Sequence, residues 1–328
     1  MRGDTVAKDA IGVNAVLPTV CHAEEGGSGG GTESRAGGLF SLAERIGWDE
    51  NCSNLPYSTQ VFDSTYLAPT DVDRDHLDID RVLRETFVVD VQHHATLDST
   101  NDRARRCAAE TSGELPLLVI ADRQTAGRGR GTNRWWTGRG SLAMTLLLTR
   151  DQVGVRQVGQ SPLVALATAL AVADTLAPLL PGRRVGIRWP NDVFADGGKL
   201  AGILVEVLPD GRHIVGIGVN TNNSLADAPP ELRTTAATLY DLTGRHHDRT
   251  TFLVELLSHL EDALGQSTSE PDRIGARANR LCLQHGETLT VEQGRRTIRG
   301  RCAGIAPDGA LLLETDDGRQ SFYSGVLL

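Results

Sequence analysis

The sequence predicts an α+β protein, in which a mixed β-sheet packed with helices is followed by a small β-barrel of the SH3 kind. Three observations favour this fold. From about residue 84 onward, apolar strands alternate with helical segments. The turns DGG (196–198) and PDGR (209–212) join successive strands tightly. The last fifty residues alternate short strands with the turns QGR, PDGA and DDGR, a pattern typical of a small barrel.

Composition limits the classes of protein that need to be considered. The chain has 328 residues, of which 40% are hydrophobic, so a sizeable core is available. Its net charge of −9 argues against a surface devoted to nucleic acid. No uninterrupted apolar run of membrane-spanning length is present, and the first twenty residues lack a signal core, so we expect a cytoplasmic protein without a membrane partner. The five cysteines include no C-x-x-C pair and indicate reduced thiols.

The sequence predicts three regions along the chain. Residues 1–82 are expected to form a poorly structured extension, because they contain a Gly/Ser-rich linker and an acidic stretch short of core residues. A short helix at 40–48 is one option within it. The extension shows no basic recognition helix, so no DNA partner is expected. The sheet domain would occupy residues 83–276 and the barrel residues 277–328.

Hydrophobic patterns place the elements of the sheet domain. A helix at 98–110 is expected to begin near the capping residues Asp98, Ser99 and Thr100. The helix at 161–180 is apolar on nearly all sides and should be buried. Another, at 250–265, would be capped by Thr250 and end at Gly265. Strands are predicted at 86–95, 115–121, 141–148, 185–189, 199–208 and 212–220.

The segment DRQTAGRGRGTNRWWTGRGS (122–141) lies between two of these strands. Its glycines allow the backbone to approach a ligand, and Arg128 and Arg130 offer planar donors suited to phosphate or carboxylate. Trp135 and Trp136 offer flat faces to a ring or form a lid. The spacing matches neither a Walker loop nor a dinucleotide-binding loop. It favours an anion-binding role over a solvated loop or an RNA-binding Arg/Gly tract.

A second cluster, RWPNDVFADGGKLAGILVE (188–206), contains Asp192 and Lys199. Asp192 is suited either to hold Mg²⁺ or to order a basic side chain, although the Pro-Asn-Asp tripeptide taken alone favours a plain turn. The chain has 33 lysines and arginines, of which only Lys8 and Lys199 are lysines. A position that keeps lysine in so arginine-rich a chain favours a site that needs a compact ammonium group. A third cluster, GIGVNTN (216–222), places the amide of Asn220 at a strand end.

Together and in this order, these segments resemble the biotin protein ligases. The matching stretches are LDSTN (97–101), QTAGRGRGTNRWW (124–136), RWPNDV (188–193), GGKLAGILVE (197–206) and GIGVN (216–220), with GIAPDGALLLE (304–314) resembling the C-terminal β module. The chain departs from common patterns at Gly131-Thr132 and at Arg188. The resemblance covers residues 84–328 and does not include the DNA-binding domain of the repressor-type members.

The resemblance implies an activity and a set of site residues. It implies that biotin and ATP, with Mg²⁺, form biotinyl-5′-adenylate, and that biotin then passes to a lysine of a biotin carboxyl carrier protein. A homodimer is left open. The catalytic residues would be Lys199, Arg130 and Asp192, with Asp192 also the Mg²⁺ ligand. The biotin-binding residues would be Ser99, Thr100, Asn101, Gln124, Arg128, Gly129, Arg130 and Lys199. The ATP-binding residues would be Arg128, Arg130, Trp135, Asn191, Asp192 and Asn220.

The chemistry of adenylation fits these residue types. Joining a carboxylate to an α-phosphate brings two anions together, so cationic groups must neutralise both. The adenylate hydrolyses readily, so the segment 122–141 is predicted to be a mobile lid that orders around it. The alternatives are a lipoate ligase with the same adenylation step and a non-catalytic protein that binds biotin or a nucleotide. The latter would not require Lys199 together with both loop arginines.

Overall fold

The computed structural model describes residues 76–110, 113–153 and 161–328. All described residues belong to one compact unit. Most of the expected extension, including the helix proposed at 40–48, therefore lies outside the described residues. Its last residues are described, and α2 (Ile79–Glu85) begins there, with Val82 fully buried.

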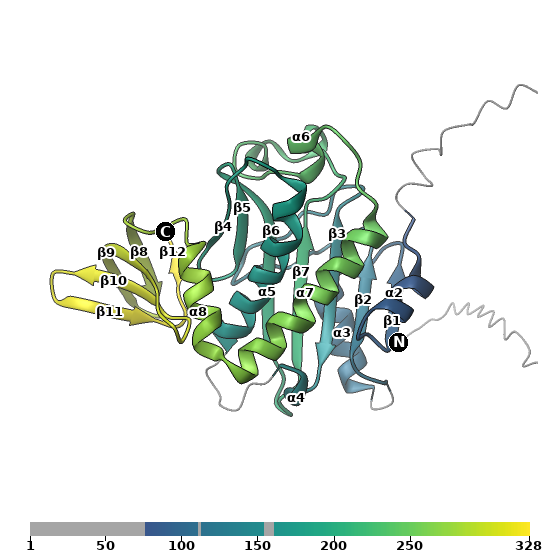
Figure 1. The fold of residues 1–328 in the computed structure, drawn as a ribbon, viewed down its shortest axis with the longest axis horizontal. Coiled ribbons are helices and arrows are strands. Elements are labelled where there is room, and N and C mark those ends of the chain that lie inside the picture. Colours follow the sequence, from purple (N-terminus) through teal and green to yellow (C-terminus); the bar gives the residue numbers. More distant parts are fainter. Residues whose placement is uncertain (1–75, 111–112, 154–160) are drawn as a thin grey trace, which may run out of the picture. The chain divides into compact units, whose positions relative to one another are not determined.

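The larger domain is built on a seven-stranded sheet in the order β1-β2-β3-β7-β6-β5-β4 (Figure 1). Strands β1 and β2 are parallel and all other neighbours are antiparallel, so the sheet is mixed, as predicted. The strands are β1 (Asp90–His94), β2 (Leu117–Ala121), β3 (Leu142–Leu148), β4 (Val185–Arg188), β5 (Asp192–Ala195), β6 (Gly198–Val207) and β7 (His213–Val219).

Helices cover both faces of this sheet. On one face α5 (Ser161–Leu176) packs against α7 (Arg249–Ser269) and α8 (Pro271–Arg280) over the main apolar core. On the other face α3 (Thr100–Ala109) closes a smaller apolar cluster, in which Ala104 and Cys107 accompany Leu147 of β3. The short helices α4 (Arg150–Val153) and α6 (Leu239–Thr243) lie beyond opposite ends of the strands (Figure 1).

Helix α5 is buried, as its sequence predicts. The window Pro162–Leu179 is long and apolar enough to cross a membrane by composition alone, and 72% of it is buried inside the structure. Packing against the sheet and α7 therefore accounts for its composition.

Three local predictions were wrong or incomplete. The expected Pro-Asn-Asp turn is present at Pro190 and Asn191, but Asp192 already begins β5, which pairs with β4 and β6. Helix α7 is capped by Asp248, whose carboxylate accepts from the backbone N–H of Thr251, and it continues past Gly265 to Ser269. Glycine is tolerated there because the tertiary packing of Leu256, Leu260 and their neighbours stabilises the helix. The sequence reading also assigned no element to α8.

The C-terminal module is a five-stranded antiparallel sheet in the order β11-β10-β9-β8-β12. The expected turns separate its strands. These are β8 (Thr288–Gln293), β9 (Arg296–Ile305), β10 (Leu311–Thr315), β11 (Gly318–Phe322) and β12 (Val326–Leu327).

Candidate active site

A cavity of about 550 Å³ lies between the seven-stranded sheet, the loop 122–141 and the C-terminal module. Segments far apart in sequence meet there, because β3, β5, β6 and β7 each contribute residues to its wall. All the predicted site residues line it except Asn220; they are Ser99, Thr100, Asn101, Gln124, Arg128, Gly129, Arg130, Trp135, Asn191, Asp192 and Lys199. The sequence motifs therefore converge on one cavity.

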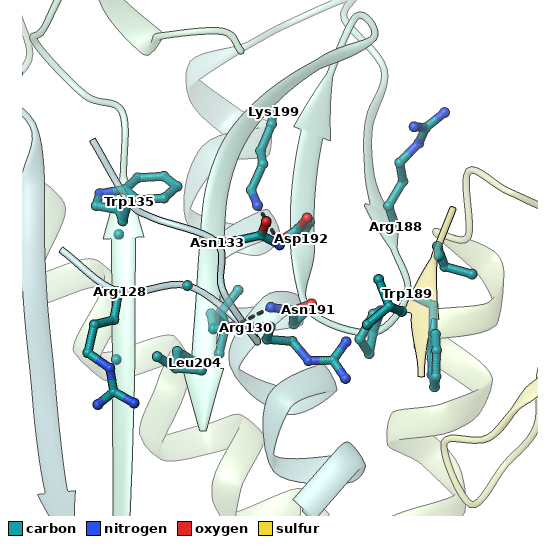
Figure 2. A pocket seen from close by; sticks show the side chains of 18 of the residues that line it. Arg128, Arg130, Asn133, Trp135, Arg188, Trp189, Asn191, Asp192, Lys199 and Leu204 are labelled. Carbon is teal, nitrogen blue, oxygen red and sulfur yellow. Dashed lines mark hydrogen bonds and ion pairs between the residues drawn. The ribbon is translucent and has the colours of Figure 1, made fainter. Parts of the chain in front are cut away.

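Lys199 and Asp192 form an ion pair inside the cavity, where both side chains are partly covered (Figure 2). Nζ of Lys199 lies 2.7 Å from Oδ1 of Asp192. It also lies 5.9 Å from the centre of the Trp135 ring, within the range of a cation–π interaction. Lys199 reaches this place from the start of β6, and Asp192 from the start of β5, where its register partner in β6 is Gly202. Of the two roles left open for Asp192, the free protein shows the ordering of a basic side chain.

Arg130 supplies a second cation, which has no partner within the described residues. Its guanidinium makes no ion pair or side-chain hydrogen bond there, although it lines the cavity next to Asn191 (Figure 2). Partial burial lowers the pKa of Arg130, and the nearby charge of Asp192 opposes this effect. Arginine stays protonated under such shifts. The cavity therefore contains a partly desolvated positive charge suited to an anion.

Three glycines leave room for the side chains that shape the cavity. Gly202 of β6 and Gly218 of β7 are partners in register, and a Cβ at Gly218 would overlap the indole of Trp135. A Cβ at Gly216 would overlap the amide of Asn101. The bare face of these two strands is thus the surface on which Trp135 and Asn101 lie.

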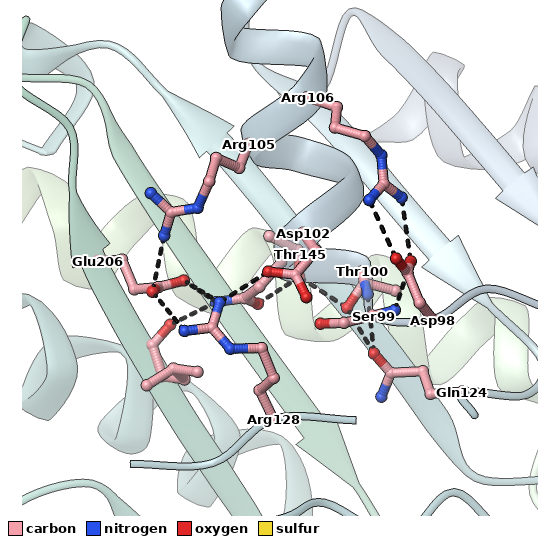
Figure 3. Close-up of polar contacts among 12 residues, drawn as sticks. Asp98, Ser99, Thr100, Asp102, Arg105, Arg106, Gln124, Arg128, Thr145 and Glu206 are labelled. Atoms are coloured by element: carbon pink, nitrogen blue, oxygen red, sulfur yellow. Dashed lines mark hydrogen bonds and ion pairs between the residues drawn. The ribbon is translucent and has the colours of Figure 1, made fainter. Parts of the chain in front are cut away.

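Arg128 is held differently from Arg130. One guanidinium nitrogen donates to Asp102 at 2.8 Å and the other to Glu206 at 3.0 Å (Figure 3). Arg105 also donates to Glu206, at 2.7 Å, and the amide of Asn101 donates to it at 3.0 Å. Sequence reasoning missed this carboxylate cluster, although Glu206 ends the GGKLAGILVE segment. Arg128 is therefore paired with two carboxylates in this structure.

A neutral polar network lies at the start of α3 (Figure 3). Oε1 of Gln124 accepts from the backbone N–H of Thr100 at 2.8 Å. The hydroxyl of Thr145, fully buried in β3, lies 2.8 Å from Oγ1 of Thr100 and donates to Oδ1 of Asn101 at the same distance. Ser99 precedes the helix as its N-cap, but its hydroxyl makes no capping bond. Thr145 was also missed, although it is the only hydrogen-bonding side chain in the strand LAMTLLL.

The loop 122–141 folds as a hairpin at its tip. The N–H of Gly129 donates to the carbonyl of Asn133, and that of Trp135 to the carbonyl of Gly127. Gly131 at the tip has φ +61°, a conformation that glycine adopts without strain. These backbone bonds direct Trp135 toward β7. That the loop 122–141 is a mobile lid stays a prediction.

Two predicted ATP-binding residues make structural hydrogen bonds. The side-chain amide of Asn191 donates to the carbonyl of Ile203, fixing the end of the Pro190 turn to β6. Asn220 is buried outside the cavity lining, and its amide donates to the carbonyls of Ala237 and Lys199. Its position therefore favours holding the backbone of Lys199 over contact with a ligand.

Sequence reasoning did not anticipate that the C-terminal module and the turn leading into it contribute to the cavity wall. Gln284 and Glu287 line it, as do residues of β8 and β12. Glu287 lies 3.8 Å from Arg188, whose guanidinium also lies over the Phe194 ring. No local motif marks these residues, because their place depends on how the module packs.

Comparison with known proteins gives matches over the same part of the chain. Residues 94–222 match the Biotin/lipoate A/B protein ligase family, and residues 285–326 match the Biotin protein ligase C terminal domain. The chain is 35% identical over 241 residues to the biotin–[acetyl-CoA-carboxylase] ligase of Paracoccus denitrificans, covering 69% of this chain and 95% of that protein. It is 31% identical over 237 residues to the bifunctional ligase/repressor BirA of Bacillus subtilis, covering 71% of each.

A solved structure shares the fold as well. The biotin protein ligase from Aquifex aeolicus, in complex with biotin and ATP, matches 73% of this chain and 98% of its own, with a TM-score of 0.64 and 28% identity. Both domains and the motifs at the cavity are therefore accounted for by one family, and the chain belongs to the biotin protein ligases.

Proposed function

We propose that this chain joins biotin and ATP into biotinyl-5′-adenylate and transfers the biotinyl group to a lysine of a biotin carboxyl carrier protein. In the first step a carboxylate oxygen of biotin attacks the α-phosphorus and pyrophosphate leaves. In the second the lysine amine attacks the acyl carbon, AMP leaves and the amine releases a proton. The observation that carries the proposal is the pair of cations, Lys199 and Arg130, in one cavity with Trp135.

Different parts of the cavity suit different chemical groups of the two substrates. Biotin has a neutral polar ring at one end and a carboxylate at the other, and the ring suits the hydroxyl and amide groups of Ser99, Thr100, Asn101 and Gln124. Its carboxylate would then lie toward Lys199 and Arg130. The α-phosphate suits the same cations, because charge builds on its oxygens in the transition state. Trp135 offers a flat face near Lys199 for the adenine ring or for closing the site.

Mg²⁺ is part of this proposal. Within the residues described, no three His, Cys, Asp or Glu side chains gather at metal-binding distance. Mg²⁺ is commonly held by one or two carboxylates together with substrate phosphates, and Asp192 in the cavity fits that arrangement. The ion would neutralise charge on the leaving pyrophosphate, while Lys199 remains available for the reacting oxygens.

Exchange of labelled pyrophosphate into ATP tests the reaction. We expect exchange with Mg-ATP only when biotin is present. Lipoate in place of biotin is the decisive comparison, because the matched family includes lipoate ligases. Exchange that lipoate supports and biotin does not would assign the cavity to lipoate. Tight biotin binding without any exchange would indicate a non-catalytic binding protein.

A further inference from the structure

One side of a turn of the C-terminal module packs against the larger domain. The segment Ala306–Ala310 joins β9 to β10 and closes on itself, with the N–H of Ala306 donating to the carbonyl of Ala310 at 2.8 Å. Its residue Gly309 is buried and has φ +87°. Pro307 and Asp308 at its tip face solvent, as turns between antiparallel strands normally do, whereas Gly309 does not. The turn belongs to the GIAPDGALLLE segment.

The turn fits closely against two helices of the larger domain. A Cβ at Gly275 of α8 would overlap the carbonyl oxygens of Ala306 and Pro307. A Cβ at Gly309 would come within 3.2 Å of the side chains of Leu163 and Leu166 in α5. Glycines at both contact points therefore let the backbone of the turn approach the helices.

The same turn is hydrogen-bonded to a residue of the candidate active site. Nε1 of Trp189 donates to the carbonyl of Gly309 at 3.1 Å, and the backbone N–H of Trp189 donates to Oε1 of Gln284 at 2.7 Å. Trp189 is only 1% exposed. Both ends of this residue are thus fixed by the C-terminal part of the chain. Two residues later along the chain comes Asn191, and then Asp192, which pairs with Lys199.

We propose that the turn Ala306–Ala310 and Trp189 are positioning elements, which set the place of Asp192 relative to Lys199 and thereby the rate of adenylate formation. This inference rests on the proposed function. The hydroxyl and amide groups around Thr100 belong to α3, the loop after β2 and β3, and their hydrogen bonds among the described residues do not involve the turn. Displacing the turn should therefore slow the reaction without weakening biotin binding.

Gly275→Ala is the test, with Gly265→Ala as its matched control. Both glycines lie in helices, where alanine is the more favourable residue, so helix propensity does not explain a loss. Gly265 has open space around a Cβ, whereas at Gly275 the turn must withdraw by about 1 Å, a displacement that can cost on the order of 100-fold in rate. The measurements are the maximal rate of biotin-dependent pyrophosphate exchange, the biotin Kd by calorimetry and the melting temperature, all on the full chain.

We expect Gly275→Ala to lose on the order of 100-fold in maximal exchange rate while its biotin Kd changes less than about threefold. Gly265→Ala should match the unsubstituted chain in both. Equal exchange rates in the two variants would overturn the inference, and so would parallel losses of rate and biotin affinity. Absence of exchange in the unsubstituted chain and in Gly265→Ala would instead count against the proposed function.

Trp189→Phe provides the second variant if Gly275→Ala does not fold. It removes the indole N–H that bonds Gly309 and keeps an aromatic ring in the core. A reduced exchange rate with unchanged biotin Kd supports the inference. A folded Trp189→Phe with normal exchange contradicts it, as does failure of both variants to fold, because the turn would then serve only the stability of the fold.

Discussion

The two ends of the cavity differ in how their polar groups are satisfied. At the start of α3, the side chains of Thr100, Asn101 and Gln124 are already bonded to one another or to Thr145. At the starts of β5 and β6, the guanidinium of Arg130 has no partner among the described residues, and Lys199 has the single carboxylate of Asp192. One end is prepared for a neutral polar group, whereas the other holds positive charge that an anion can complete.

Arg128 and Arg130, two residues apart in the loop, also differ in whether their guanidinium groups already have partners. Arg128 donates to Asp102 and Glu206, so an anionic ligand must compete with two carboxylates for it. Among the described residues Arg130 makes no ion pair, and only the nearby charge of Asp192 acts on it. Two arginines of one motif can therefore differ in how available they are to an anionic ligand, because neighbouring elements supply carboxylate partners to one and not to the other.

The largest expected effect comes from Lys199→Arg, at the charged end. The charge is kept, but the planar guanidinium is larger than an ammonium group and cannot take the place of Nζ, 2.7 Å from Asp192, without displacing a neighbouring group. We expect adenylate formation to fall on the order of 100-fold in a protein that folds normally, with Lys199→Ala at least as impaired. Exchange kinetics and a melting curve check this. Near-normal turnover of the arginine variant at low biotin would show that Lys199 has no catalytic role.

Arg130→Gln and Arg128→Gln form a matched pair of variants. Together they test whether the arginine without an ion pair contributes more to ATP binding than the paired one. A hydrogen bond to a charged group contributes about 1.5–3 kcal/mol, so losing Arg130 should raise the KM for ATP by about 10-fold to 100-fold. Losing Arg128 should have a smaller effect on ATP, because its charge is already balanced by Glu206 and Asp102. If Arg128→Gln raises the KM for ATP more than Arg130→Gln does, the ion pairs of this structure do not predict which arginine binds the nucleotide.

Thr145→Val tests the neutral end. It keeps the shape of the side chain but removes the hydroxyl that bonds Asn101 inside a buried site, an unmet bond that costs about 1–3 kcal/mol. We expect biotin to bind about tenfold more weakly, with the KM for ATP unchanged. Thr168→Val is the control, since Thr168 is equally buried but its hydroxyl bonds only within α5. Similar biotin affinities in the two variants would contradict a role of the Thr145 network in binding.

The smallest effect concerns Asp98, just before α3. The Arg106 guanidinium, and next the backbone N–H of Ser99, hold the pKa of Asp98 at about 2. Because this is below the ordinary carboxyl value of about 3.9, the contribution to stability is present above pH 4 and is lost as the pH falls through 2. The pair is half exposed, so it contributes only about 0.2–1 kcal/mol. Asp98→Asn should lower the melting temperature by about 1–3 °C at pH 7, and the difference between the two proteins should shrink as the pH falls from 4 toward 2.

Much of the fold could be predicted from the sequence, because hydrophobic period and turn residues report local structure. The burial of α5 and the turns of the C-terminal module are examples. Strand β5 was hidden by its Pro-Asn-Asp start, since those residues signal a turn whether or not pairing follows. The motif residues could be assigned to one site, yet their partners could not. The pairing of Arg128 with Glu206 joins residues 78 positions apart, and only the packed sheet brings them together.

The glycines of the cavity floor constrain how this site can change. Gly202, Gly216 and Gly218 already carry the smallest side chain available, so substitution there can only narrow the space beside Trp135 and Asn101. An effort to evolve the cavity toward bulkier acids must therefore act on side chains that can be shortened, such as Met144 and Leu204. Conversely, the single methyl group of Gly218→Ala would displace Trp135. This substitution would therefore exclude a ligand from the cavity without changing a charged residue.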